Sequence, residues 1–477
     1  MRGGGGFGRM CGMEKTVPAI DARAKRDYFD LLRMQSVGAD PARLPECEKC
    51  AGWIKSYIEG MPGFEAELYR GEGFEDAPPI VLARRAGAPG APTVLFYGHY
   101  DVQPEDPVEE WLTPPFEPTE KDGRVYCRGA QDDKGQWFAF LEGVRALIGE
   151  GGPLPELKIV LEGQEESGSS ALIALAERLA PRLKADVLAV CDTHAGPDFR
   201  PAIVAGLRGV VSFTVNLYGA PHDLHSGTHG GVAPNAAQGI AALVASLHTP
   251  DGAIAVEGFR DGILPPSDEE LAAAREGSQS DAEYEAETGC APEGGEKGVD
   301  RILRNSFMPT IEVNGIHSGY GGPGGKTVIP AAATAKISMR IVPGQTPAGV
   351  LDAVRRHLEA RVPRGMRMEI CDVKPGAPGC RLPLSSPVFA LAARTLSAFD
   401  PRGPVFQWDG ASIPVVSVLQ DVSGAAPLLV GFGREEDRIH SPNESYGLDQ
   451  FAAAARWGRE ITRAIALSDI ARKGGEQ

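Results

Sequence analysis

The sequence predicts an α/β protein with a mixed, mostly parallel sheet, helices on both faces, and an inserted α+β domain. In the first part of the chain, apolar runs short enough for buried strands alternate with segments of helical spacing. Polar residues follow several of these runs, which is typical of a sheet with a site along one edge. Beyond about residue 206 the strands alternate polar and apolar residues, which indicates a sheet with one solvated face.

The expected elements of the first part are helical segments within 22–60, strands at 80–83 and 93–97, a helix after Gly135, and strands at 157–161 and 187–191. The insert contributes strands at 209–217, 333–341 and 366–370 and helices at 235–248 and 268–288. The chain then returns to helix, strand, a loop over 431–445 and a last helix from Asp449 to about Arg472. These elements predict an α/β domain over 13–207 and 383–472, interrupted by an inserted α+β domain over 208–382.

Composition limits the class of protein. With 42% hydrophobic and 23% charged residues among 477, the chain has the composition of a soluble globular protein. A net charge of −16 argues against nucleic acid as a partner, because phosphate binding needs Lys and Arg. No apolar run is long enough to span a membrane. Residues 1–12 are glycine-rich and are expected to form a flexible tail, and eight scattered cysteines predict reduced thiols in the cytoplasm.

Five residues are candidate metal ligands. They are His99, Asp132, Glu166, Asp192 and His440. Histidines and carboxylates together suit zinc or another divalent transition ion. A carboxylate with two oxygens can bridge two ions about 3.5–4 Å apart, so five ligands are enough for a pair of sites.

Each motif taken alone also has a plainer interpretation. The Glu165–Glu166 pair after an apolar strand equally describes a solvated acidic turn, and Asp132–Asp133 before a helix equally describes a helix cap. Cys47 and Cys50 fit the start of a helix better than a zinc or redox site, because no second pair accompanies them. The combination of motifs along the whole chain favours the metal site.

Several segments together carry a resemblance to a known family. They are HYDVQP (99–104), GAQDDKG (129–135), EGQEESGS (162–169), HSG (225–227) and HSPNE (440–444). In this order they resemble the M20 metallopeptidases, and most of all the cytosolic nonspecific dipeptidase, or carnosinase-like, branch. The resemblance implies a homodimeric dizinc exopeptidase, with manganese as the alternative to zinc.

The resemblance also implies roles for the residues around the metals. One ion would be held by His99 and Asp192 and the other by Glu166 and His440, with Asp132 as the bridge. Asp101, two residues after His99 and on the same face of the extended chain, would orient its imidazole. Glu165 would act as the general base.

Two residues of the insert complete the implied site. Arg340 resembles the family's carboxylate-binding arginine, and a guanidinium suits a small substrate with a free carboxylate. His225 would reach into the partner subunit's site and hydrogen-bond the oxyanion. The alternatives are a salt-bridged strand residue for Arg340 and a turn with a solvent-exposed imidazole for His225.

One segment departs from the branch. Where the dipeptidases usually read REGGSIP, this chain reads WDGASIP at 408–414. Asp409 keeps a carboxylate to meet a substrate's α-ammonium, Ser412 is a further substrate-binding candidate, and Trp408 removes a charge. The expected activity is hydrolysis of dipeptides or similarly short peptides. The alternatives are an amidohydrolase acting on N-acyl or N-carbamoyl amino acids, which would have no use for Asp409, and a catalytically silent metal-bearing protein.

Overall fold

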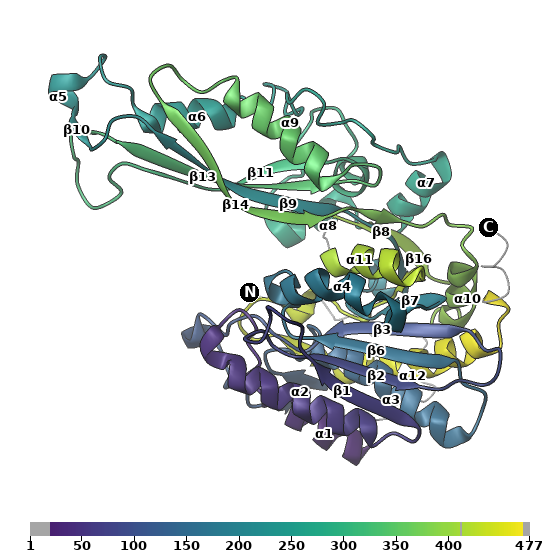
Figure 1. The fold of residues 1–477 in the computed structure, drawn as a ribbon. Coiled ribbons are helices and arrows are strands. Elements are labelled where there is room, and N and C mark those ends of the chain that lie inside the picture. The colour runs from purple at the N-terminus through teal and green to yellow at the C-terminus, as the bar shows by residue number, and fades with distance from the viewer. Residues whose placement is uncertain (1–19, 411–412, 471–477) are drawn as a thin grey trace, which may run out of the picture.

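The computed structural model describes residues 20–410 and 413–470. The expected tail over 1–12, the candidate Ser412 and the end of the chain from 471 lie outside these residues. The described part contains no helix that is both long and apolar enough to cross a membrane. A main domain and the insert are separate bodies in Figure 1, and the chain passes between them twice, near residues 207–209 and 377–380.

The main domain is built on a nine-stranded sheet. In spatial order its strands are β1 (Phe64–Tyr69), β2 (Ile80–Arg85), β6 (Glu156–Glu162), β3 (Thr93–His99), β7 (Val187–Val190), β17 (Ala426–Leu429), β8 (Ala202–Leu207) and β15 (Cys380–Arg381), with β16 (Val405–Asp409) also paired to β8. The central pairs β6–β3, β3–β7 and β7–β17 are parallel, as is β16–β8. The remaining pairs are antiparallel, so the sheet is mixed, as predicted.

Helices cover both faces of this sheet, because alternate strand residues point to opposite sides. Val94 and Phe96 of β3 pack in one core and Leu95 and Tyr97 in the other. The first face carries α1 (Ala22–Leu32), α2 (Leu44–Glu59), α3 (Lys134–Glu150), α10 (Pro387–Leu396) and α12 (Leu448–Ala466). The second carries α4 (Ser170–Leu183) and α11 (Pro414–Ser423).

The insert contains an antiparallel sheet with helices on one face. Its strand order is β11 (Thr310–Ser318), β13 (Ala332–Ile341), β9 (Gly209–Tyr218) and β14 (Arg367–Ala377). Alternate residues of β13, such as Ile337 and Met339, are buried against α6 (Ala236–Ala245) and α9 (Pro347–Glu359). At the far end, a short pair of β10 (Leu224–His225) and β12 (Val328–Ile329) adjoins α5 (Ser226–His229).

Three expected elements differ from those observed. The helix expected over 268–288 is two helices, α7 (Asp268–Glu276) and α8 (Asp281–Thr288), because Gly277 ends the first and Ser280 caps the second. The strand expected over 366–370 continues to Ala377 with bulges against β9. The last helix ends at Ala466, where Leu467 leaves the core and is 68% exposed.

A further three-stranded sheet was not expected from the sequence. It consists of β18 (Ser445–Gly447), β5 (Arg124–Tyr126) and β4 (Thr119–Lys121). Strands of three residues are too short to show an alternating pattern. This sheet joins the region before α3 to the region before α12.

Candidate metal centre

Neighbouring parallel strands bring three of the candidate ligands to one edge of the main sheet. β6, β3 and β7 run in the same direction, so their carboxyl ends lie together. His99 is the last residue of β3, and Asp192 follows β7. Glu165 and Glu166 begin a 3-10 turn (Glu165–Ser167) shortly after the end of β6.

Two loops supply the remaining ligands. Asp132 precedes α3, and His440 lies in the loop before β18. The two loops are tied together because β18 pairs with β5 and the amide of Cys127 donates a 3.0 Å hydrogen bond to the carbonyl of Glu444. His440 has a φ of 59°, a left-handed conformation that non-glycine residues adopt mainly where the surroundings enforce it.

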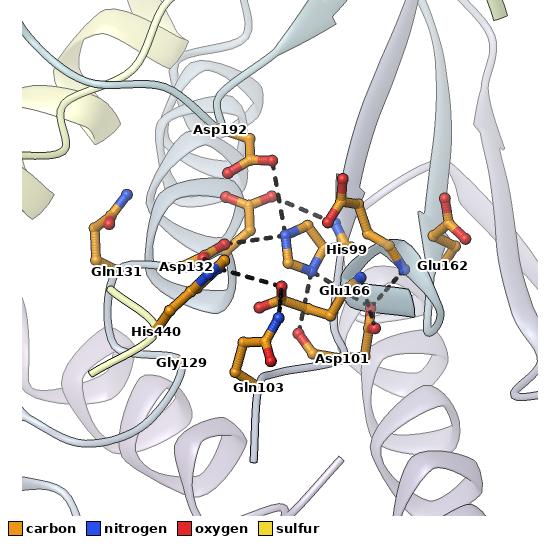
Figure 2. Close-up of polar contacts among 12 residues, drawn as sticks. His99, Asp101, Gln103, Gly129, Gln131, Asp132, Glu162, Glu166, Asp192 and His440 are labelled. Atoms are coloured by element: carbon orange, nitrogen blue, oxygen red, sulfur yellow. Dashed lines mark hydrogen bonds and ion pairs between the residues drawn. The ribbon is translucent and has the colours of Figure 1, made fainter. Parts of the chain in front are cut away.

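Asp132 stands between the two histidines (Figure 2). Its Oδ1 lies 3.1 Å from His99 Nε2 and its Oδ2 lies 2.9 Å from His440 Nε2. Glu166 Oε2 is 3.3 Å from the same nitrogen of His440, and Asp192 Oδ2 is 3.7 Å from Nε2 of His99. The structure therefore brings all five predicted ligands together, with one oxygen of Asp132 facing each half.

The potential ligand atoms form two groups, each within 4.8 Å: His99, Asp133 and Asp192 in one, and Asp132, Glu166 and His440 in the other. Asp133 was not among the predicted ligands. Although it occupies the N-cap position of α3, its side chain makes no capping hydrogen bond there. Instead its Oδ2 accepts from the backbone N–H of His99 at 3.3 Å. The signal in the sequence that could have suggested Asp133 as a ligand is that it directly follows Asp132, a predicted ligand.

Asp101 connects the histidine to the turn that carries the two glutamates. Its two carboxylate oxygens accept the backbone N–H groups of Glu165 and Glu166, each at 3.1 Å. The backbone carbonyl of Asp101 lies 3.1 Å from His99 Nδ1, and its Oδ1 lies 3.4 Å from the same atom. Asp101 thus contacts the imidazole that it is predicted to orient, and it also holds the acidic turn, a contact that the sequence did not predict.

Gln103 also contacts a candidate ligand. Its side-chain amide donates a 2.7 Å hydrogen bond to Glu166 Oε2 (Figure 2). Gln103 lies in the HYDVQP segment, but the sequence pattern gave it no role. The contact orients the carboxylate that faces His440.

Burial sets the electrostatics of the cluster. It raises the pKa of Glu165 well above its usual range, and it raises the pKa of Asp192 to about 7 against the opposing charge of His99. Burial also acts on Asp132, but hydrogen bonds to His440 and His99 outweigh it and hold the pKa of that carboxyl low. Hydrogen bonds to Asp132 and Glu166 raise the pKa of His440 to about 10.

These carboxylates fit a pair of divalent cations. Among the described residues, their ion-pair partners are the two imidazoles, which must carry protons to serve as cations. Cations would relieve the repulsion among buried carboxylates, and metal binding would displace those protons. The donor set of imidazoles and carboxylates is the one that divalent transition ions prefer.

The remaining candidates lie elsewhere. Arg340 is on β13, opposite Val210 at the end of the insert next to the main domain. Asp409 ends β16. Burial and the nearby charge of Arg340 lower the pKa of Arg208 to about 10, and Asp409 opposes this shift, so the three charged groups share one region. Arg208 joins β8 to β9, and its Nε donates a 2.8 Å hydrogen bond to the carbonyl of Gly410.

His225 and Trp408 have contrasting surroundings. His225 is exposed in β10 at the far end of the insert (Figure 1), where its Nδ1 accepts the N–H of Gly227 at 3.0 Å. Trp408 is only 5% exposed and packs against Phe307 with ring centroids 5.2 Å apart. The tryptophan therefore fills a core position.

The fold and the clustered ligands define an α/β metallohydrolase with an inserted lid. The model of the peptidase family M20/M25/M40 matches residues 95–464, and the chain belongs to this family. It is 32% identical over 382 residues to a Beta-Ala-His dipeptidase of Rattus norvegicus, covering 77% of this chain and 76% of the relative. It is 31% identical over 389 residues to the Cys-Gly metallodipeptidase DUG1 of Saccharomyces cerevisiae, covering 80% of each.

A solved structure shares the whole architecture. The M20 family metallo-carboxypeptidase Sso-CP2 from Sulfolobus solfataricus superimposes with a TM-score of 0.84 at 26% identity. The match covers 94% of this chain and 100% of the other. The predicted family and fold class are confirmed.

Proposed function

We propose that this protein is a metallopeptidase that hydrolyses the peptide bond of dipeptides or similarly short peptides. The observation that carries the proposal is the cluster in which the two oxygens of Asp132 face His99 and His440. The relatives named above as dipeptidases support the substrate class.

One ion would be held by His99 and Asp192 and the other by Glu166 and His440, with Asp132 shared between them. Zinc is the expected metal, with manganese as the alternative. When bound, such a pair supplies Lewis-acid activation of water and of the scissile carbonyl near neutral pH. Asp133, whose side chain reaches the His99 group, is a further candidate ligand.

The proton transfers are assigned to Glu165. It would take a proton from the attacking water and return it to the leaving amine. Asp101 would keep Glu165 in place through the backbone N–H at 3.1 Å while it orients His99. In this assignment Glu165 transfers protons and does not bind a metal ion.

His225 would serve the active site of a second subunit. It is exposed at the end of the insert, and Figure 1 places β10 and α5 far from the strand ends that carry the metal ligands. This separation supports a homodimer in which each insert lends its imidazole to the partner as an oxyanion donor. The insert over 208–382 would then be both the lid and the dimerisation domain, and residues 13–207 and 383–472 would form the catalytic domain.

Recognition of the two substrate ends is assigned to opposite charges. Arg340 would bind the free carboxylate as a guanidinium fork, and Asp409 would bind the α-ammonium. Their shared influence on Arg208 supports a common pocket. Ser412 is proposed as a further substrate contact, although it lies outside the described residues. The cysteines that the structure describes are free thiols, which supports a cytoplasmic location.

The proposal is tested by a substrate panel and metal analysis on one preparation. Dipeptides with a free amine should be hydrolysed with a higher kcat/KM than N-acyl or N-carbamoyl amino acids, and each subunit should contain two divalent ions. A preference for the N-blocked compounds would favour the amidohydrolase. Two bound ions with no hydrolysis of either class would favour a binding protein.

A further inference from the structure

Glu444 is a buried carboxylate for which the proposed mechanism has no use. It ends the HSPNE segment that contains His440, and it is only 1% exposed. A buried carboxylate is costly unless it is paired and hydrogen-bonded. Its partners therefore indicate what its position requires.

Four donors surround this carboxylate. Oε2 accepts from Arg128 Nη1 at 2.9 Å and from the backbone N–H of Gly129 at 3.0 Å. Oε1 accepts from the backbone N–H of Gln131 at 3.0 Å and from that of Asp132 at 3.1 Å. One side chain thus binds three amides of the loop that ends at the shared ligand, including the amide of Asp132 itself.

The loop that carries Glu444 is also fixed. Neighbouring Asn443 accepts the N–H of Leu112 at 2.7 Å and donates to the carbonyl of Glu110 at 2.9 Å. Figure 2 shows Gln131 beside Asp132, with His440 and then Gly129 below them. Glu444 therefore joins the loop of one ligand to the loop of another.

We propose that Glu444 is a positioning residue that holds Asp132 at the correct place relative to His440 and so sets the affinity for the ions that share Asp132. Three buried amides would lose their acceptor without it, and the loop would have to move to satisfy them. Partners that orient metal ligands typically change metal affinity about 10–100-fold when removed. The inference rests on the proposed two-metal function.

The test is Glu444→Gln in the full chain. The amide keeps the size of the side chain but presents an NH₂ group to donors that need an acceptor. Protein loaded with Zn²⁺ is dialysed against a series of chelator concentrations, and the retained zinc is measured by elemental analysis. We expect at least one zinc ion to be removed at about a 10–100-fold lower chelator concentration than from the unmodified protein.

Glu142→Gln is the matched control. Glu142 is also buried, at 9% exposure, and it accepts from Arg23 Nη1 at 3.1 Å and from the Tyr57 hydroxyl, away from the metal ligands. It should lower the melting temperature of the metal-free protein without changing the chelator profile. A Glu444→Gln profile that matches the parent and this control would overturn the inference.

Glu444→Asp covers the case in which the amide variant does not fold. The aspartate keeps the charge but retracts the oxygens by one methylene, so a weaker zinc affinity in the folded variant supports the positioning role, and a parent-like affinity contradicts it. A parent protein that binds no divalent ion would overturn the proposed two-metal function itself, which is a different outcome from normal binding in all variants.

Discussion

The sheet edge and the far end of the insert are built in opposite ways. At the edge, the candidate ligands range from buried His99 and Asp132 to exposed His440. Further side chains hold this region, as Asp101 holds the acidic turn and Gln103 holds Glu166. At the end of the insert, His225 is exposed, and its segment pairs with β12 over only two residues. The candidate ligands at the edge are held by other side chains of the same chain, whereas His225 is held by the N–H of Gly227 and by the pairing of β10 with β12.

If the proposed dimer forms, this difference separates the properties that one chain would have from those that would need a partner. A cluster whose ligands all come from one chain can hold ions in a single subunit, so changes there should alter the metal content. An exposed histidine far from that cluster should matter for turnover only when a partner is present. The following experiments test this division.

The largest effect is expected for Asp132→Ala. Both halves of the cluster contact this carboxylate, so its loss should remove at least one ion and reduce activity to the assay background. Metal content and activity are measured on the same sample. Full occupancy of both sites in this variant would break the assignment of Asp132 as the bridge.

Glu165→Gln should lower the rate of hydrolysis without changing the metal content of the site at the sheet edge. A general base contributes about 10²–10⁴-fold, so kcat should fall by that order while both ions stay bound. Steady-state kinetics and elemental analysis provide the two measurements. Turnover near that of the parent would show that another group accepts the proton.

His225→Ala tests the other region. Loss of one oxyanion donor typically costs about 10²–10³-fold in kcat, and the metal content should not change. Co-expression with Glu165→Gln subunits sharpens the result, because a mixed dimer has one site with an intact Glu165 and a partner-supplied His225. Purified mixed dimers should recover roughly half of the parent activity, since one of two sites is complete.

If these mixed dimers are as inactive as the His225→Ala and Glu165→Gln homodimers, the histidine acts within its own chain. The separation seen in Figure 1 would then have to close through a movement of the insert. Metal loss in His225→Ala alone would likewise contradict the division between the two regions.

Asp409→Ala should have the smallest effect and the most selective one. Loss of a charge-assisted contact costs about 1.5–3 kcal/mol, which corresponds to about 10–100-fold in kcat/KM for free-amine dipeptides. N-blocked substrates should change much less. Equal losses on both classes would remove Asp409 from ammonium recognition and favour the amidohydrolase.

The sequence predicted the candidate ligands at the sheet edge better than the residues that hold those ligands in place. His99 and Asp192 follow apolar runs that are recognisable as parallel strands, so their meeting at one edge follows from topology. Capping was the plainer alternative for the Asp132–Asp133 pair because aspartate is common at helix starts, and only the three-dimensional contact with His99 places Asp133 beside a candidate ligand. The backbone N–H of Asp132 donates to Glu444 across 312 residues of sequence, a separation at which periodicity carries no information.

Other differences have local causes. The insert's acidic segment was expected as one helix because charge and spacing continue across Gly277, yet the cap at Ser280 restarts it. Trp408 was considered as a lost charge in the site. Its packing against Phe307 shows that its first effect is on the core, with Asp409 next to it at the end of β16.

The two connections of the insert have an evolutionary consequence. β8 leads into the insert and β15 follows it, and these strands are hydrogen-bonded neighbours, with Cys380 opposite Leu207. The chain thus departs from and returns to almost the same point of the main sheet. A segment that leaves and re-enters the sheet at one point can change in length or sequence during evolution without rerouting any strand that carries a candidate metal ligand.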